Sequence, residues 1–177
     1  MNLQDAMEQR RSIRCYKQQP VDEKNIRTML EAARLAPSWK NSQVTRYHVV
    51  QTPEMLAKVK GTLAEFNQKN AQDASVLIVT SIVLNRAGFE RDGTPSNELG
   101  NGWGYYDCGL GSMNLLLKAE ELGLSTLVMG IRDADKIRAI LEIDEKESIV
   151  SVIGVGYKDI EPEMPKRKAL DDIAKFY

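Results

Sequence analysis

The apolar run from Val76 to Leu84 sets the strongest limit on the fold of this chain, and only Thr80 and Ser81 interrupt it. A helix that crosses a bilayer needs about 20 apolar residues, so this run is far too short to span a membrane. A short apolar run of this kind is typical of a buried β-strand. We therefore expect a sheet with this segment in its interior.

Helical and strand patterns follow one another irregularly along the chain. Asp22 is a suitable N-cap for a helix, with Val21 and Ile26 at the positions of a hydrophobic staple, and Thr52 with Pro53 marks another helix start. We expect helices over residues 3–11, 22–36 and 103–122, and another that begins at Asp133. A further helix is expected from Pro53, with an apolar face formed by Met55, Leu56, Val59, Leu63 and Phe66. We expect further strands at 47–51, 126–129 and 149–155. Because this order is not strict βαβ alternation, it predicts an α+β fold with helices around one central sheet. No repeat or linker is visible, so we expect one domain over residues 1–177.

Composition excludes several classes of function. The chain carries 24 Lys and Arg against 25 Asp and Glu, a formal net charge of −1, so we expect neither a nucleic-acid nor a membrane partner. The polar first 14 residues show no signal peptide, and Cys15 and Cys108 are the only cysteines, which predicts free thiols and a cytoplasmic protein. His48 is the only histidine, so a His-rich metal site cannot form. Its place in the alternating run 46–50 indicates a structural strand residue, and we expect no metal.

The segment Arg10-Arg11-Ser12-Ile13-Arg14 is the first to suggest chemistry. One helical turn separates Arg10 from Arg14, so their guanidinium groups can converge on one anion, and Ser12 adds a hydroxyl donor. Phosphate suits this group because it offers several acceptors that arginine meets in a forked geometry. The other interpretation is a solvated helix end whose cations face the negative end of the helix dipole.

A polar loop from Pro37 to Gln43 is the second candidate. Its Asn and Gln amides both donate and accept hydrogen bonds, as the edge of a heterocycle requires, and Trp39 offers an aromatic face for stacking. The alternative is a polar turn with Trp39 packed into the core. Residues 86–102 have the weakest periodicity and predict a mobile loop near a site, with disorder as the alternative. Trp103, Tyr105 and Tyr106 follow this loop and either shape a substrate pocket or pack in a core or interface.

These motifs, in this order, resemble the nitroreductase family of flavoproteins. The resemblance rests on Arg-Arg-Ser-x-Arg at 10–14, Ala-Pro-Ser-x-x-Asn-Ser-Gln at 36–43, the helix at 107–119, the strand at 123–130 and the basic segment at 167–173. It implies a mostly antiparallel central sheet flanked by helices and an intertwined homodimer with FMN at the interface. It also implies NADH or NADPH as the electron donor.

The resemblance also assigns roles to single residues. Arg10, Arg11, Ser12 and Arg14 would hold the FMN phosphate and nearby flavin atoms, and Arg167 and Lys168 would close over the same phosphate. Pro37, Ser38, Trp39 and Asn41 would come from the partner subunit to line the ring. Asn67 would approach the pyrimidine edge, and Met129 and Gly130 would present backbone groups beside the ring. The substrate pocket above it would include Trp39, Trp103, Tyr105 and Tyr106. Glycines 109 and 111 would permit close helix packing at the dimer core, or packing within one subunit.

The implied reaction has two half-reactions at one site. NAD(P)H would pass hydride to flavin N5 and leave, and a nitroaromatic, quinone or enone acceptor would take its place. No protein acid or base would be essential, so we name no catalytic side chain. Trp39 replaces a residue that is small in many relatives, and Met129 one that is acidic in some, which leaves the small-molecule acceptor open. Two alternatives are an FMN-binding redox sensor or flavin store, and a cofactor-free module that binds partners through its basic segments.

Overall fold

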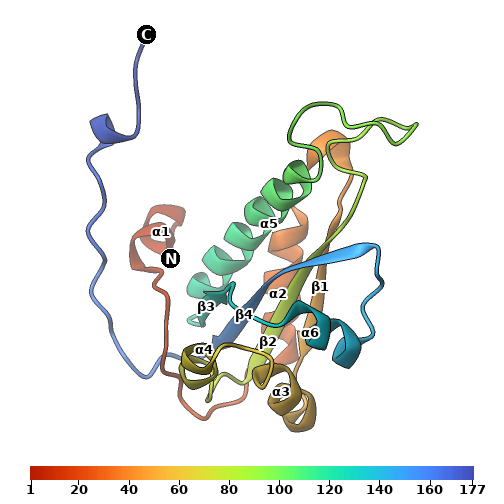
Figure 1. The fold of residues 1–177 in the computed structure, drawn as a ribbon. Helices are drawn as coiled ribbons and strands as arrows, with labels where there is room; N and C mark the ends of the chain where they lie inside the picture. The colour runs from red at the N-terminus through yellow and green to blue at the C-terminus, as the bar shows by residue number, and fades with distance from the viewer.

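The apolar run forms β2 (Val76–Val83), an inner strand of a four-stranded sheet with the order β1-β2-β4-β3. The other strands are β1 (Thr45–Val50), β3 (Ser125–Met129) and β4 (Glu147–Gly156), and all neighbouring strands are antiparallel. The computed structural model describes all 177 residues, and Figure 1 shows the sheet between two groups of helices. The α+β fold with a central antiparallel sheet is thereby confirmed.

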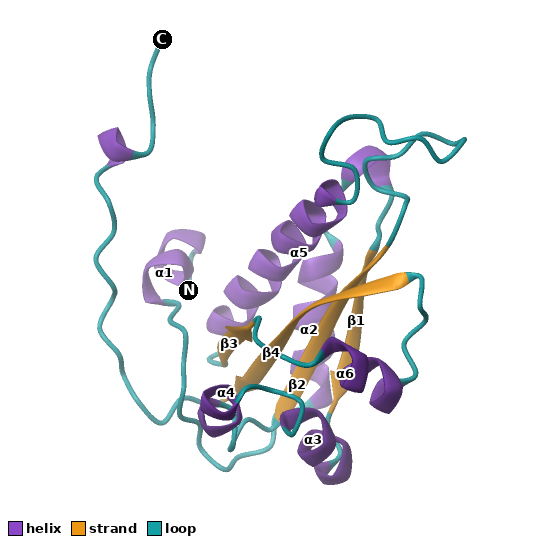
Figure 2. Ribbon diagram, in the orientation of Figure 1, coloured by secondary structure: helices purple, strands orange, loops and turns teal.

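Helices cover both faces of the sheet, as Figure 2 shows. One face is covered by α2 (Glu23–Arg34) and the 20-residue α5 (Gly102–Glu121), and the other by α3 (Pro53–Lys60), α4 (Glu65–Asn70) and α6 (Ala134–Leu141). The short α1 (Leu3–Gln9) packs against α5. Two 3₁₀ turns, η1 (Trp39–Asn41) and η2 (Leu170–Asp172), complete the elements.

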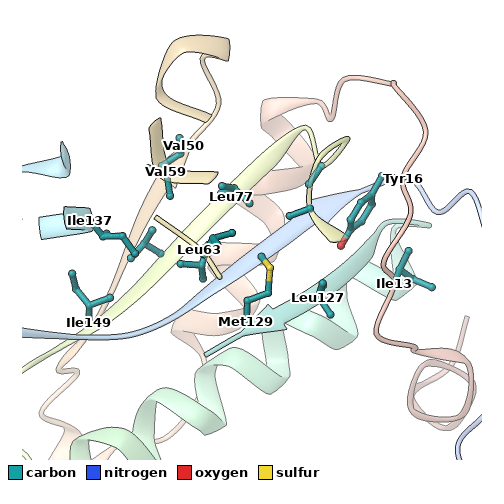
Figure 3. Packing of buried hydrophobic residues seen from close by; sticks show 14 of the residues in the cluster. Ile13, Tyr16, Val50, Val59, Leu63, Leu77, Leu127, Met129, Ile137 and Ile149 are labelled. Carbon is teal, nitrogen blue, oxygen red and sulfur yellow. The ribbon is translucent and has the colours of Figure 1, made fainter. Parts of the chain in front are cut away.

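The two-residue period of a strand divides the core between the two faces. Leu77 and Val79 belong to the cluster under α3 and α6, whereas Val76 and Ile78 belong to the cluster under α2 and α5. Figure 3 shows the first cluster, with side chains from β2, β3, α6 and the N-terminal segment gathered over the sheet. All residues of β2 except Val83 are buried, as a strand covered on both faces requires.

Local sequence explains where several helices begin. The side chains of Asp22, Thr52 and Asp133 each accept a hydrogen bond from a backbone N–H in the first turn of the helix that follows. Val21 and Ile26 are buried in the same cluster, as expected for a hydrophobic staple. These caps satisfy N–H groups that a helix start otherwise leaves unpaired.

Two helix predictions need correction. The helix expected from Pro53 through Phe66 ends at Lys60, and α4 begins only at Glu65. The chain turns between them because Leu63 pairs with Arg132 in an isolated bridge, and Phe66 is left 55% exposed rather than in the core. The first helix ends at Gln9 instead of Arg11 because the next residues run along the edge of β3.

The segment 86–102 contains no helix before α5 begins and no strand, as expected, but polar contacts fold it back on itself. Ser96 N donates to Gly88 O at 2.8 Å, and the side chains of Asn85 and Asn101 bond to one another at 3.0 Å. Both cysteines are free, and Cys108 is buried. None of the helices combines the length and apolarity that crossing a bilayer requires.

Candidate active site

The N-terminal arginines lie on an extended segment and not on a helix. Ser12 pairs with Thr126 of β3 in a parallel bridge, and Ile13 N donates to Thr126 O at 3.0 Å. The premise that one helical turn separates Arg10 from Arg14 is therefore wrong. Extended backbone still places Arg10, Ser12 and Arg14 on one side, because their spacing is two residues. Ile13 points the other way and is buried.

The arginines differ in what they already bind. No ion pair of the structure includes Arg10, Arg11 or Arg14. Arg11 folds back onto its own backbone, since its Nη1 donates to Glu8 O and to Arg10 O, and its Nε is buried without a partner. Arg14 makes one long hydrogen bond, of 3.3 Å, to Ser12 O. Arg10, Ser12 and Arg14 are consequently the groups free to bind an anion.

Glu120, which the sequence analysis did not single out, lies beside this cluster. Burial raises the pKa of the Glu120 carboxyl, and the charges of Lys158, Arg10 and Arg11 oppose that rise. Glu120 stands in the last turn of α5, so the arginines lie at the C-terminal end of that helix. Lys118 and Glu121 flank it in the sequence, so no sequence signal set Glu120 apart.

Asn67 contacts the chain just after the end of β3, the strand beside which the N-terminal arginines lie. Asn67 is buried on α4, and its Nδ2 donates to Ile131 O at 3.2 Å. Ile131 follows Met129, which is buried at the end of β3, and Gly130, which is exposed with no heavy atom within 4 Å of an added Cβ. Asn67, Met129 and Gly130 therefore lie in or next to β3, the strand with which the arginine-bearing segment pairs at Ser12. We use the term β3 group for the residues Arg10, Ser12, Arg14, Asn67, Met129 and Gly130.

The loop from Pro37 to Gln43 is a strained turn. Lys40, Asn41 and Gln43 have φ values of 45°, 54° and 49°, a region that side chains other than glycine rarely adopt. Such conformations persist where the surroundings hold them, and they cluster at functional sites. Ser38 Oγ accepts a hydrogen bond from Gln43 N at 3.0 Å, and Asn41 is exposed.

Aromatic residues from α5 pack against this turn. The ring centroids of Trp39 and Trp103 lie 4.7 Å apart with a tilt of 44°, and Tyr106 meets Trp103 edge-on at 5.8 Å. The Nε1 of Trp39 is buried and has no partner. Tyr105 is not part of this cluster, because its hydroxyl bonds to Ser148 Oγ of β4 at 2.9 Å. We call Pro37, Ser38, Trp39, Asn41, Trp103 and Tyr106 the loop group.

The N-terminal arginines of the β3 group and the loop group lie at opposite ends of α5 (Figure 1). Trp103 and Glu120, which mark the two ends, are 17 residues apart, which corresponds to about 25 Å along a helix. One flavin ring cannot bridge that distance. Within a single chain, the residues that the sequence analysis assigned to one site therefore form two half-sites.

The basic C-terminal segment stands apart from both groups. Beyond Asp159 the chain has no regular element except η2, and Figure 1 shows it leading away from the body. Arg167 Nη1 donates only to Pro165 O, and no hydrogen bond or ion pair joins Arg167 or Lys168 to Arg10 or Arg14. The structure of one chain does not bring the two basic clusters together.

Comparison with known proteins decides the family. The model of the nitroreductase family matches residues 7–157, which run from the last turn of α1 through β4 and include all residues of both groups. The chain belongs to the nitroreductase family. The fold comparison agrees, since solved structures of nitroreductase family proteins align with almost the whole chain.

Three relatives illustrate how far the family likeness extends. A protein of Archaeoglobus fulgidus, named for NADH dehydrogenase/NAD(P)H nitroreductase activity, is 28% identical over 152 residues, 84% of this chain and 80% of its own length. A protein of Methanothermobacter thermautotrophicus with the same name is 31% identical and covers 89% of this chain and 78% of its own. A nitroreductase structure from Exiguobacterium sibiricum, solved in complex with FMN, superimposes with a TM-score of 0.88 at 24% identity and covers 100% of this chain and 98% of its own.

Proposed function

We propose that this protein is a dimeric FMN enzyme that uses NAD(P)H to reduce nitroaromatic, quinone or enone acceptors in two successive half-reactions. As a member of the nitroreductase family, the chain is an NAD(P)H-dependent oxidoreductase with FMN as its cofactor. The acceptor class, the dimer and the residue roles are the proposed part.

The separation of the two half-sites along α5 carries this proposal. A two-fold axis across α5 would bring the loop group of one copy to the β3 group of the other and would form two complete sites. The outer surface of α5 suits such an interface, because Tyr105, Tyr106 and Met113 are exposed by 43%, 60% and 40%. Leu170, Ile173 and Phe176 of the C-terminal segment are also more than half exposed. Apolar side chains exposed in such numbers mark a surface that another chain covers.

The residues of the β3 group fit the phosphate and ring of FMN. Arg10 and Arg14 carry cationic groups without an ion-pair partner, and the Ser12 hydroxyl lies on the same side of the segment. Phosphate supplies the charge and the acceptors that these donors lack. In the dimer, Arg167 and Lys168 would add to this charge, and the open surface above Gly130 would let a flat ring approach the backbone.

The protein would bind and orient the reactants, while the two-electron chemistry is that of bound FMN. Asn67, held by its bond to Ile131 O, would offer its remaining amide atoms to the pyrimidine edge of the ring. The partner's loop group would close the other side, with Trp39 and Trp103 forming an aromatic wall of the acceptor pocket. A flat aromatic or quinonoid acceptor suits that wall because stacking favours it.

A flavin titration of matched variants tests the proposal. We expect the wild type to bind FMN more tightly than riboflavin, which lacks the phosphate, and Arg14→Ala and Arg10→Ala to remove most of that preference while riboflavin affinity stays the same. Arg27→Ala is the control, since Arg27 is paired with Glu23 on the surface of α2. Loss of FMN and riboflavin binding together would mean that these arginines do not hold the phosphate.

Anaerobic addition of NADH or NADPH then distinguishes an FMN enzyme from a protein that only stores or senses flavin. Bleaching of the bound flavin, followed by its reoxidation with a quinone or nitroaromatic compound, is the expected result. A bound flavin that neither nucleotide bleaches would favour a sensor or flavin store. A protein that takes up no flavin would contradict the proposed function.

A further inference from the structure

Asp107 is a buried carboxylate that the proposed reaction does not use. It lies on α5, is 5% exposed, and belongs to no ion pair. Its Oδ2 accepts a hydrogen bond from the backbone N–H of Trp39 at 2.9 Å. A buried charge without an ionic partner is costly, so a chain that keeps one must gain something from it.

The hydrogen bond from Trp39 N to Asp107 stabilises a turn whose backbone conformation is unfavourable. The three residues with positive φ, Lys40, Asn41 and Gln43, lie within the four residues that follow Trp39. Each of these conformations is unfavourable for a residue that is not glycine, so the turn needs contacts that outweigh the strain. Besides the Asp107 carboxylate, the polar contacts of the turn include short-range bonds such as Gln43 N to Ser38 Oγ and the exposed ion pair of Lys40 with Glu90. Of these three contacts, only the bond to Asp107 involves a buried charged side chain.

Two side chains on the same face of α5 contact Trp39. Asp107 binds its backbone, and Trp103, four residues earlier, packs on its ring at 4.7 Å. Residues four apart stand one above the other on a helix, so the two contacts form a clamp. A cavity of about 370 Å³ adjoins this clamp, with Asp107, Pro37, Ser38 and Tyr47 in its wall, so no packed layer replaces the carboxylate as a support for the loop.

We propose that Asp107 is a positioning residue, which fixes the height and tilt of Trp39 and thereby the wall that the loop group presents to the partner's flavin. The effect on flavin binding rests on the proposed function. The contacts of Asp107 and Trp103 with Trp39 do not depend on it. Asp107 touches neither flavin nor acceptor in this proposal, and it acts through the Trp39 backbone.

The Trp39–Trp103 pair supplies a readout that does not depend on flavin. The chain has only 2 tryptophans, so a couplet between two indole transitions in the circular dichroism spectrum can come only from this pair. We expect Asp107→Leu, which keeps the branched shape of the side chain and removes the acceptor, to abolish or strongly reduce the couplet in the apoprotein. Asp107→Asn, whose amide oxygen still accepts the Trp39 N–H, should retain it.

Flavin binding tests the consequence. An unpaired buried N–H and a displaced wall should weaken FMN binding about tenfold in Asp107→Leu, with Asp107→Asn close to the wild type. Leu115→Ala is the control, since it damages the core two turns along the same helix and does not touch Trp39. It should lower stability yet keep the couplet and the FMN affinity. If Asp107→Leu does not fold, Asp107→Ala takes its place, and the Asp107→Asn comparison holds in either case.

The outcomes separate the inference from the function on which it rests. A couplet unchanged in Asp107→Leu, or lost equally in Asp107→Asn and Leu115→Ala, would overturn the positioning role. A wild type without FMN binding would overturn the proposed function, while the couplet would still decide whether Asp107 positions Trp39.

Discussion

The ammonium of Lys40 lies 3.1 Å from both carboxylate oxygens of Glu90 and so joins two loops that are 50 residues apart in sequence. The same carboxylate accepts a hydrogen bond from Ser96 Oγ at 2.6 Å, and Lys40 Nζ stands 5.7 Å from the centroid of the Trp39 ring. The 86–102 loop is therefore tied to the strained turn of the loop group. This tie is exposed to water, with both side chains at least half accessible.

We expect Glu90→Gln to loosen the loop without unfolding the protein. Exposed ion pairs contribute little to global stability, so the melting temperature should stay within about 2 °C. Hydrogen exchange of residues 88–100 at neutral pH should become faster, measured by mass spectrometry. Hydrogen bonds from Ser96 and Lys40 lower the pKa of Glu90 from its ordinary 4.5, so the tie is intact above that value and is lost as the pH falls through the lowered pKa. Glu54→Gln, which breaks a similar pair on α3, should leave this loop unchanged.

Local chemistry determined what could be predicted from the sequence. The starts of α2, α3 and α6 depend on the capping side chains Asp22, Thr52 and Asp133, and all three were predictable because a cap acts over a few residues. The end of α1 was predicted wrongly because pairing of Ser12 with Thr126 draws the chain away, and that partner is more than 100 residues distant. The break after α3 has the same kind of cause, the pairing of Leu63 with Arg132.

The candidate site shows the same division. The residue types that suit a phosphate and a heterocycle were visible in the sequence, but their division between the two ends of α5 follows from the fold. Asp107 escaped notice because a lone acid in a helix is usually a surface residue. Its neighbours Cys108 and Gly111 are buried, and an acid beside them was the available signal.

Gly111 of α5 lies close to Tyr47 of β1. A Cβ there would lie 2.5 Å from the Tyr47 hydroxyl oxygen and 3.5 Å from Ala33 O. We expect Gly111→Ala to lower the free energy of unfolding by about 1–3 kcal/mol, as overpacking does. In a Tyr47→Phe background the same change should cost less than half as much, since the clashing oxygen is gone.

Gly109 is the matched control for this prediction. A Cβ there would meet nothing within 4 Å in one chain, so Gly109→Ala should be neutral or should stabilise the monomer by up to about 1 kcal/mol. Urea denaturation of the four variants measures both effects. Equal losses for Gly111→Ala with and without the Tyr47 hydroxyl would show that the clash lies elsewhere.

Asp107 should also give the stability of the protein a specific pH dependence. Burial raises the pKa of its carboxyl above the ordinary 3.8, and the hydrogen bond from Trp39 N opposes that rise only in part. The folded state therefore holds this proton to a higher pH than the unfolded state does. The stability from this group is complete below 3.8 and is lost as the pH rises through the raised pKa. The melting temperature of Asp107→Asn relative to the wild type should accordingly increase over that range, and a constant difference would contradict the shift.

His48 should matter for stability and not for turnover. Its Nε2 lies 2.9 Å from Ser81 Oγ and 3.1 Å from Glu147 Oε2, and it links three neighbouring strands on the face opposite to α5. We expect His48→Leu to lower the free energy of unfolding by about 1–2 kcal/mol because it removes bonds to partly buried groups. The value of kcat/KM with a quinone acceptor should stay within about twofold of the wild type, because the flavin carries the chemistry. A loss of more than tenfold in a folded variant would point to a catalytic imidazole.

The outer face of α5 allows the dimer and the complete site to be tested together. Met113 is 40% exposed beside the open surface of Gly109, where a two-fold axis would place it against a second α5. Met113→Glu would then bring two carboxylates into an apolar contact, which should weaken the dimer more than about 100-fold. Light scattering should show the mass falling from twice 19.9 kDa to 19.9 kDa, and FMN affinity should fall with it, since in the proposed dimer each chain supplies half of each site. Ala139→Glu adds the same charge to the exposed side of α6 and should change neither mass nor affinity. A monomeric Met113→Glu that binds FMN as tightly as the wild type would show that the β3 group alone forms the cofactor site.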